Sequence, residues 1–253
     1  MNHRNPKAVG HPRLLLERIL DGAPARKGAH APGTAVAHDW LVWQLMDSAF
    51  PTGGFAHSAG LEAAWQHGEV RGRDDLVSYL DASLQQLGHA SLPFVTAAFG
   101  EPKKLAELDR LNDAFTINHV ANRASRAQGR AMLSAVERIF KCDAGRAESG
   151  EALPYAHFAP VFGACFRLLG LPRETTGRMF FFNHLRSLLA AAVRLNSVGP
   201  MEAQMLQQRL APKAEEILRQ CDSLSLDDLA QTAPLLDLWQ GAQDRLYSRL
   251  FQS

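Results

Sequence analysis

The chain has 253 residues, of which 46% are hydrophobic and 21% are charged, as is ordinary for a soluble globular protein with a sizeable core. Its formal net charge of +1 gives no global field that would recruit nucleic acid or an anionic membrane. The three cysteines, Cys142, Cys165 and Cys221, lie too far apart for a disulfide framework and fit a reducing, cytoplasmic environment.

Residues 1–37 are predicted to form a flexible N-terminal arm. Pro12, Pro24 and Pro32 interrupt a polar, alanine-rich run there, and no apolar centre of a secretory signal is visible. Within the arm, Leu14–Leu20 could form a short helix.

Residues 38–253 are predicted to form a single all-α domain, a helical bundle of about eight to ten helices. Alternating runs rich in Val, Ile and Thr, which are typical of strands, are almost absent. Apolar residues instead recur at spacings of three and four, and four stripes stand out: Leu76–Leu87, Val120–Ile139, Phe158–Leu169 and Phe181–Leu195.

Several residues indicate where these helices begin and end. Asp74 is a possible cap of the first stripe, and Gly170 supplies a stop signal after the third. Gly199-Pro200 is predicted to end the longest helix. The apolar segment Met179–Leu195 contains His184 and two arginines, so we interpret it as a buried core helix and not as a membrane span.

The sequence contains no grouping of residues typical of an enzyme. It has no phosphate-binding loop and no Cys-x-x-Cys pair, and neither Asp47 nor Glu62 has a base, nucleophile and orienting partner near it in sequence. None of the ten histidines stands four residues from another histidine or cysteine, so no metal site and no cofactor are predicted. A metal shared between chains stays open. His157, beside Tyr155 and Phe158, is the histidine we expect to be semi-buried.

One block, Asp47–Glu62, does not fit this plain helical pattern. It places Phe50 and Phe55 on either side of a Pro-Thr-Gly-Gly turn, where glycine gives the backbone unusual freedom. Phe50 is predicted to staple the turn to the core. For Phe55 two interpretations stay open, because an aromatic residue at a turn is also a typical interface anchor.

The closing segment, Leu246–Ser253, is unusually apolar for a chain end. It either docks on its own core or is held for a partner. If Tyr247, Leu250 and Phe251 anchor it, the guanidinium of Arg249 faces outward and can meet an acidic group on a partner.

These two blocks carry a family resemblance. Leu45–Glu62 resembles a signature near the start of UreF proteins, Ser-x-x-Pro-x-Gly-Gly-(aromatic)-x-x-Ser-x-Gly-Leu-Glu, and the closing Tyr-Ser-Arg-Leu-Phe-x-Ser is similar to their end. Three blocks between them match in order: Asn118–Leu133 with Arg123, Arg126, Gln128 and Gly129, His157–Gly163, and Leu185–Asn196. The resemblance covers about residues 40–253 and leaves out the first 36.

The chain departs from the family pattern in two places. Many bacterial relatives carry Gly-Gln-x-x-Gly-Gln after the long helix, where this chain has Gly199–Gln204, and plant-like members look closer there. The turn has Phe55-Ala56-His57 where Tyr or Phe with Ser-Tyr is common, which keeps the aromatic position.

The resemblance implies a urease accessory protein, which acts as a nickel-insertion chaperone and scaffold and not as an enzyme. It implies an all-α homodimer that joins UreD/UreH, recruits the GTPase UreG and so helps to load nickel into apo-urease. In the family, the C-terminal tail and the aromatic residue after the glycine pair organise the surface that binds UreG. The candidate partner-binding residues are therefore Phe55, His57, Tyr247, Arg249, Leu250 and Phe251.

Two other classes of function remain open from the sequence. An activator of the GTPase would insert Arg249 or Arg126 into the nucleotide site as an arginine finger. An enzyme with a hidden acidic or histidine site would show turnover without partners. Because the neighbours of Arg249 in sequence are apolar, docking of the closing segment on a protein surface is favoured over insertion of Arg249 into a nucleotide site.

Overall fold

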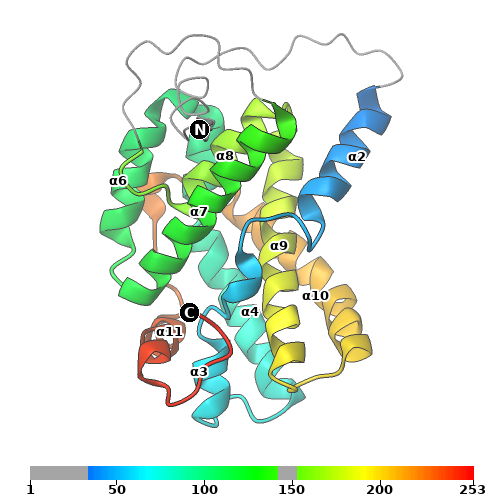
Figure 1. Ribbon diagram of the computed structural model, residues 1–253, viewed down its shortest axis with the longest axis vertical. Helices are drawn as coiled ribbons and strands as arrows, with labels where there is room; N and C mark the ends of the chain where they lie inside the picture. The colour runs from blue at the N-terminus through cyan, green and yellow to red at the C-terminus, as the bar shows by residue number, and fades with distance from the viewer. Residues whose placement is uncertain (1–33, 142–152) are drawn as a thin grey trace, which may run out of the picture.

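The predicted apolar stripes lie within helices of the computed structural model, or end one residue beyond them; the structure describes residues 34–141 and 153–253. Those residues contain no strand, and they form one helical domain, so the all-α prediction is confirmed (Figure 1). The α-helices are α2 (Thr34–Met46), α3 (Leu61–Gln66), α4 (Arg73–Ala90), α5 (Leu92–Gly100), α6 (Leu105–Phe115), α7 (His119–Phe140), α8 (Phe158–Leu168), α9 (Arg173–Arg194), α10 (Pro200–Cys221) and α11 (Pro234–Ala242). Short 3-10 helices occur at η1 (Gly54–Ala56), η2 (Pro102–Lys104), η3 (Leu226–Asp228) and η4 (Gln243–Arg245).

Helix α8 forms the centre of the bundle and packs against α5, α6, α7 and α9. Its residues from Ala159 to Phe166 are all buried, and the ring of Phe162 meets that of Phe180 on α9 edge-on at 5.2 Å. The approach to α5 is so close that a Cβ on Gly163 would stand 2.1 Å from the carbonyl oxygen of Val95. Only glycine permits this crossing, because real Cβ atoms need at least about 3 Å.

The segment Met179–Leu195 lies in α9 and at its C-terminal cap. Ten residues of this helix are buried, among them Phe181, Leu185 and Leu188, as the prediction of a core helix requires. Among the described residues, no helix has the length and apolar character that a membrane crossing needs.

The helix ends confirm some of the sequence signals and correct others. Gly170, with a φ of 80°, follows α8 as predicted. Asp74 is not a cap: it lies in the first turn of α4, and Gly72 occupies the cap position. Gly199-Pro200 does not end α9, which stops at Arg194. The pair instead begins α10, because a proline in the first turn lacks only an N–H that would have no helical partner anyway.

Helix α2 begins at Thr34, inside the stretch that the sequence assigned to the N-terminal arm. The rest of that predicted arm, including Leu14–Leu20, lies outside the described residues.

The loop before α8 is fixed by a buried carboxylate. Asp109 of α6 accepts hydrogen bonds from three successive main-chain N–H groups, those of Tyr155 and Ala156 at 2.9 Å and that of His157 at 2.7 Å. Ala156 adopts a φ of 61°, a conformation that needs such support. Asp109 therefore joins the loop to α6.

His157 is fully buried and not semi-buried as predicted. Its Nε2 lies 3.1 Å from Oδ1 of Asp113, and its Nδ1 lies 3.0 Å from the hydroxyl oxygen of Ser125. Burial lowers the pKa of His157 and so favours the neutral ring. Since a carboxylate can only accept, Nε2 donates to Asp113 and Nδ1 accepts from Ser125. The ring is thus a structural link between α6 and α7.

The crossing of α5 and α8 predicts the effect of Gly163→Ala. The added methyl group would force the two backbones apart, so the free energy of unfolding should fall by about 1–3 kcal/mol, as for overpacked cores. Gly100→Ala, at the end of α5, is the matched control, because its Cβ would meet nothing within 4 Å. Urea unfolding of both variants checks this, and equal stabilities would contradict the close crossing.

Candidate partner-binding site around the C-terminal segment

Residues 246–253, called here the C-terminal segment, contain no helix. After α11 and η4 the segment turns back across the bundle, where Figure 1 shows it in red beside α3 and the beginning of α7. Its main-chain groups have no helical partners, so other parts of the chain must satisfy those that are buried. Three sets of contacts do so.

The first set is centred on Glu62, in the first turn of α3. Its side chain is only 1% exposed. Oε1 accepts from the N–H of Leu250 at 2.6 Å, and Oε2 accepts from the N–H of Phe251 at 3.2 Å and from Nε2 of Gln243 at 2.5 Å. Hydrogen bonds to an ionised acceptor are about twice as strong as neutral ones. Glu62 therefore accepts the main-chain hydrogen bonds that hold the segment in place. This structural role explains why the Glu62 side chain is buried, and no catalytic role is needed.

The second set of contacts joins the end of the segment to the last residue of η1 and to the loop that follows it. The N–H of Gln252 donates to the carbonyl of Ala56 at 2.8 Å, and the N–H of Ser58 donates to the carbonyl of Ser253 at 2.5 Å. The Oγ of Ser253 lies 2.6 Å from Nδ1 of His57. Burial, with the positive charge of Arg123, lowers the pKa of His57, so its neutral form is favoured in this contact.

The third set is a stack around Arg194 of α9. Its guanidinium lies 4.0 Å from the ring centre of Phe55 and 4.2 Å from that of Phe251. It also donates to the carbonyl of Phe55 at 2.6 Å and to that of Leu250 at 3.3 Å. One arginine thereby holds the glycine turn and the C-terminal segment together. Phe251 is 4% exposed in this stack, whereas Phe55 remains 69% exposed.

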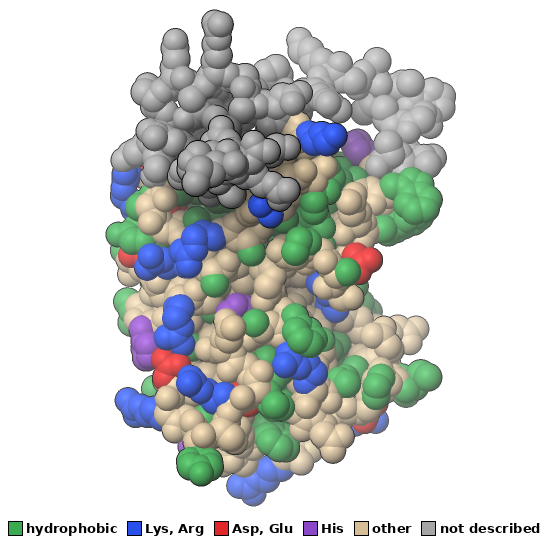
Figure 2. Space-filling view, in the orientation of Figure 1, with side chains coloured by type: hydrophobic (Ala, Val, Ile, Leu, Met, Phe, Trp, Pro, Cys, Tyr) green, Lys and Arg blue, Asp and Glu red, His purple; other side chains and the backbone are tan. Residues whose placement is uncertain are grey.

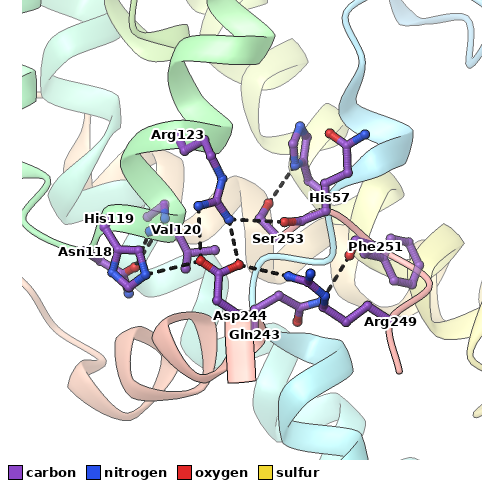
Figure 3. A network of polar contacts seen from close by, with 12 residues as sticks. His57, Asn118, His119, Val120, Arg123, Gln243, Asp244, Arg249, Phe251 and Ser253 are labelled. Atoms are coloured by element: carbon purple, nitrogen blue, oxygen red, sulfur yellow. Dashed lines mark hydrogen bonds and ion pairs between the residues drawn. The ribbon is translucent and has the colours of Figure 1, made fainter. Parts of the chain in front are cut away.

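An ion cluster around Asp244 lies beside the segment (Figure 3). Arg123 of α7 grips both carboxylate oxygens, at 2.8 and 3.1 Å, and Arg249 and His119 approach the same group at 3.0 and 3.3 Å. The pKa of the Asp244 carboxyl is lowered, chiefly by the hydrogen bond from Arg123, which outweighs the opposite effect of burial. Because the groups are partly exposed, each pair contributes at most about 1 kcal/mol to stability. The cluster positions Arg249 more than it stabilises the fold.

The structure brings the six predicted partner-binding residues into one region but gives them different environments. Phe55, Tyr247, Arg249 and Leu250 are exposed, His57 is half-buried, and Phe251 is buried. Of the three side chains considered as anchors of the segment, only that of Phe251 is buried, whereas those of Tyr247 and Leu250 are exposed. Hydrogen bonds to Glu62 hold the main chain beside Phe251. Arg249 faces outward as predicted, but it already has an acidic group within the chain. Phe50 is buried, as predicted.

Sequence reasoning missed the residues that hold the segment. These are Glu62, Ser58, Arg194, Arg123 and Asp244. One signal was present: Glu62 lies between the apolar residues Leu61 and Ala63, in a block that already stood out. A charged residue there is expensive unless it is paired.

Metal ligation is not suggested by the arrangement of side chains. In the part of the chain that the structure describes, no three His, Cys, Asp or Glu side chains gather as a metal ion would need.

Comparison with known proteins adds an independent finding. The sequence model of the UreF family matches residues 70–211. The chain is 38% identical over 219 residues to urease accessory protein F of Oryza sativa subsp. indica, with 84% of each chain covered. It is 39% identical over 221 residues to urease accessory protein F of Arabidopsis thaliana, covering 85% of this chain and 92% of that protein. Urease accessory protein UreF of Mycobacterium tuberculosis (strain ATCC 25618 / H37Rv) is 31% identical over 213 residues, with 84% and 98% covered.

The contacts of Glu62 predict what its replacement does. In Glu62→Gln, an amide NH2 group takes the place of one acceptor and leaves a buried N–H of the segment unsatisfied, which costs about 1–3 kcal/mol. Hydrogen exchange at the amides of Leu250 and Phe251 should therefore become about 5- to 150-fold faster. Glu69→Gln, at an exposed position just after α3, is the control. Unchanged exchange in Glu62→Gln would show that this carboxylate does not hold the segment.

Proposed function

The chain belongs to the UreF family of urease accessory proteins, and we propose that in urease maturation it works as a scaffold whose C-terminal segment presents a surface to other assembly proteins. The family is one of accessory proteins and not of catalytic enzymes. On this proposal the chain joins UreD/UreH, recruits the GTPase UreG and forms a homodimer, while nickel is the cargo delivered to apo-urease.

The observation that carries this proposal is a set of exposed side chains on a clamped main chain. Phe55, Tyr247 and Leu250 are large hydrophobic residues that remain exposed. Their main chain is nevertheless held: Arg194 donates to the carbonyls of Phe55 and Leu250, and Glu62 accepts from the N–H of Leu250. Next to Tyr247, the carbonyl of Ser248 accepts a hydrogen bond from Gln66 at 2.9 Å. Tyrosine and arginine are enriched among the residues that contribute most to protein interfaces. A surface that is already ordered loses less conformational entropy on binding, which favours recognition.

The recruiting surface also gives a physical route to control of a GTPase. A scaffold can shift the populations of two nucleotide states only by binding one of them more tightly than the other. An exposed aromatic and arginine surface can make such a distinction without performing chemistry.

The arginine-finger alternative is less well supported by the geometry. Arg249 is bonded to Asp244, and Arg126 lies over the ring of Tyr155 at 5.1 Å, so each would have to leave its partner in order to enter another protein. Insertion also predicts a different result: loss of the finger should slow GTP hydrolysis about 10³–10⁵-fold, even when the complex is fully formed. Rates measured at saturation therefore separate the two.

Replacement of exposed residues tests the proposed surface. Tyr247→Ala and Arg249→Ala should each weaken binding of UreG to the chain with UreD/UreH about 30-fold, equivalent to the 2 kcal/mol that defines an interface hot spot. Their free energies of unfolding should change by no more than about 1 kcal/mol, because both side chains are exposed. Met201→Ala on α10, where the side chain is also exposed, is the control.

Titration calorimetry with purified partners, beside a urea melt, makes the measurement. Wild-type affinity in both variants would remove these residues from the interface. A collapsed melting curve for Arg249→Ala would instead return that arginine to a structural role.

A further inference from the structure

A stripe of basic residues runs along one face of α7. His119, Arg123, Arg126 and Arg130 follow one another at spacings of four, three and four, which places them on the same side of the helix. At 1.5 Å per residue the stripe is roughly 16 Å long. The four residues line a groove of about 610 Å³ together with Asp113, Thr116, Ile117 and Asn122. We call it the α7 groove.

The charge of the α7 groove is not balanced from within. Arg123 is paired with Asp244. Asp113 is hydrogen-bonded to two neutral groups, Asn122 and the His157 ring, so its charge remains and attracts Arg126. Three arginines of the groove thus stand against two carboxylates. Arg126 lies over a tyrosine ring, and Arg130 donates to a carbonyl at 3.4 Å; neither forms an ion pair within the residues described. Figure 2 shows Lys and Arg side chains collected on this side of the molecule, with few acidic ones among them. This concentration stands out on a chain whose net charge is only +1.

The spacing of these charges selects between kinds of anion. A single guanidinium can bind either a carboxylate or a phosphate with two hydrogen bonds. These arginines lie one helical turn apart and do not converge on one point, so they suit several anionic groups spread along a chain better than one isolated phosphate. Single-stranded nucleic acid is usually bound by stacking of its bases on exposed aromatic rings, but in this groove the ring of Tyr155 is covered by Arg126. Ile117 at the rim is 85% exposed and offers the apolar contact that protein interfaces use.

We propose that the α7 groove binds an acidic segment, rich in Asp and Glu, of a partner protein. This inference rests on the proposed scaffold function and gives one of its partners a chemical character. The positive end of the α7 helix dipole, at His119, adds to the attraction for carboxylates. Arg123 connects the groove to the C-terminal segment, because it binds both Asp244 and the carbonyl of Gln252. A partner that contacts Tyr247 and Arg249 can therefore continue into the groove.

The test is the double variant Arg126→Gln and Arg130→Gln, in the full chain. Its matched control is Arg209→Gln and Arg219→Gln on α10, which removes the same charge from two exposed positions. The probe is a fluorescein-labelled peptide of alternating Glu and Ala, with a Gln-Ala peptide as its neutral counterpart. We expect the groove variant to bind the acidic peptide at least tenfold more weakly than wild type and control do. Added salt should weaken the wild-type complex, because exposed charges are screened.

Three results would overturn the inference. The groove variant could bind the acidic peptide as tightly as wild type does, or wild type could bind the neutral peptide as tightly as the acidic one. Alternatively, a single-stranded oligonucleotide or inorganic phosphate could displace the labelled peptide at a lower concentration than unlabelled acidic peptide does. Failure of the scaffold function is distinguishable, because it would appear as a wild-type chain that binds the acidic peptide but captures neither UreD/UreH nor UreG.

Discussion

The buried carboxylate of Glu62 is the interaction on which the arrangement of the proposed surface depends. It accepts two consecutive main-chain N–H groups from a segment almost 190 residues away, at 2.6 and 3.2 Å. Chain ends usually fray, because few contacts offset their conformational entropy. Here the side chain of Glu62 meets that requirement, and Arg194, Ala56 and Ser58 form further hydrogen bonds to the main chain of the same segment. The positions of Tyr247, Arg249 and Leu250 all follow from this attachment.

The helical bundle supports the attachment. Gly163 allows α8 to approach α5 closely, and Asp109 fixes the loop that begins α8. Helices α7 and α9 pack on α8 and thereby place Arg123 and Arg194 within hydrogen-bond distance of the C-terminal segment. A surface built on packed helices in this way is more precise than one built on loops alone. The side chains that we propose to recognise a partner are exposed, whereas the groups that position them are buried or paired.

Sequence reasoning predicted the parts of this structure that depend on local periodicity. The stripes in α4, α7, α8 and α9, the stop at Gly170 and the burial of Phe50 follow from spacing and turn chemistry. Gly199-Pro200 was misassigned because the same pair can end one helix or begin the next, and only the position of α10 decides. The sequence around Glu62 indicated that this charge needs a partner, but it did not indicate that the partner is Leu250, which is distant in sequence. Apolar character alone suggested that Tyr247 would dock, but the structure satisfies the segment through its main chain instead.

We propose that the C-terminal segment and the adjoining face of α7 form the surface that meets a partner. Hydrogen–deuterium exchange of the chain, assembled with UreD/UreH and measured with and without UreG, would locate that surface. We expect slower exchange on addition of UreG at residues 119–130 and 246–251, with no change along the exposed face of α10. Slower exchange confined to α10, or none in the C-terminal segment, would contradict it.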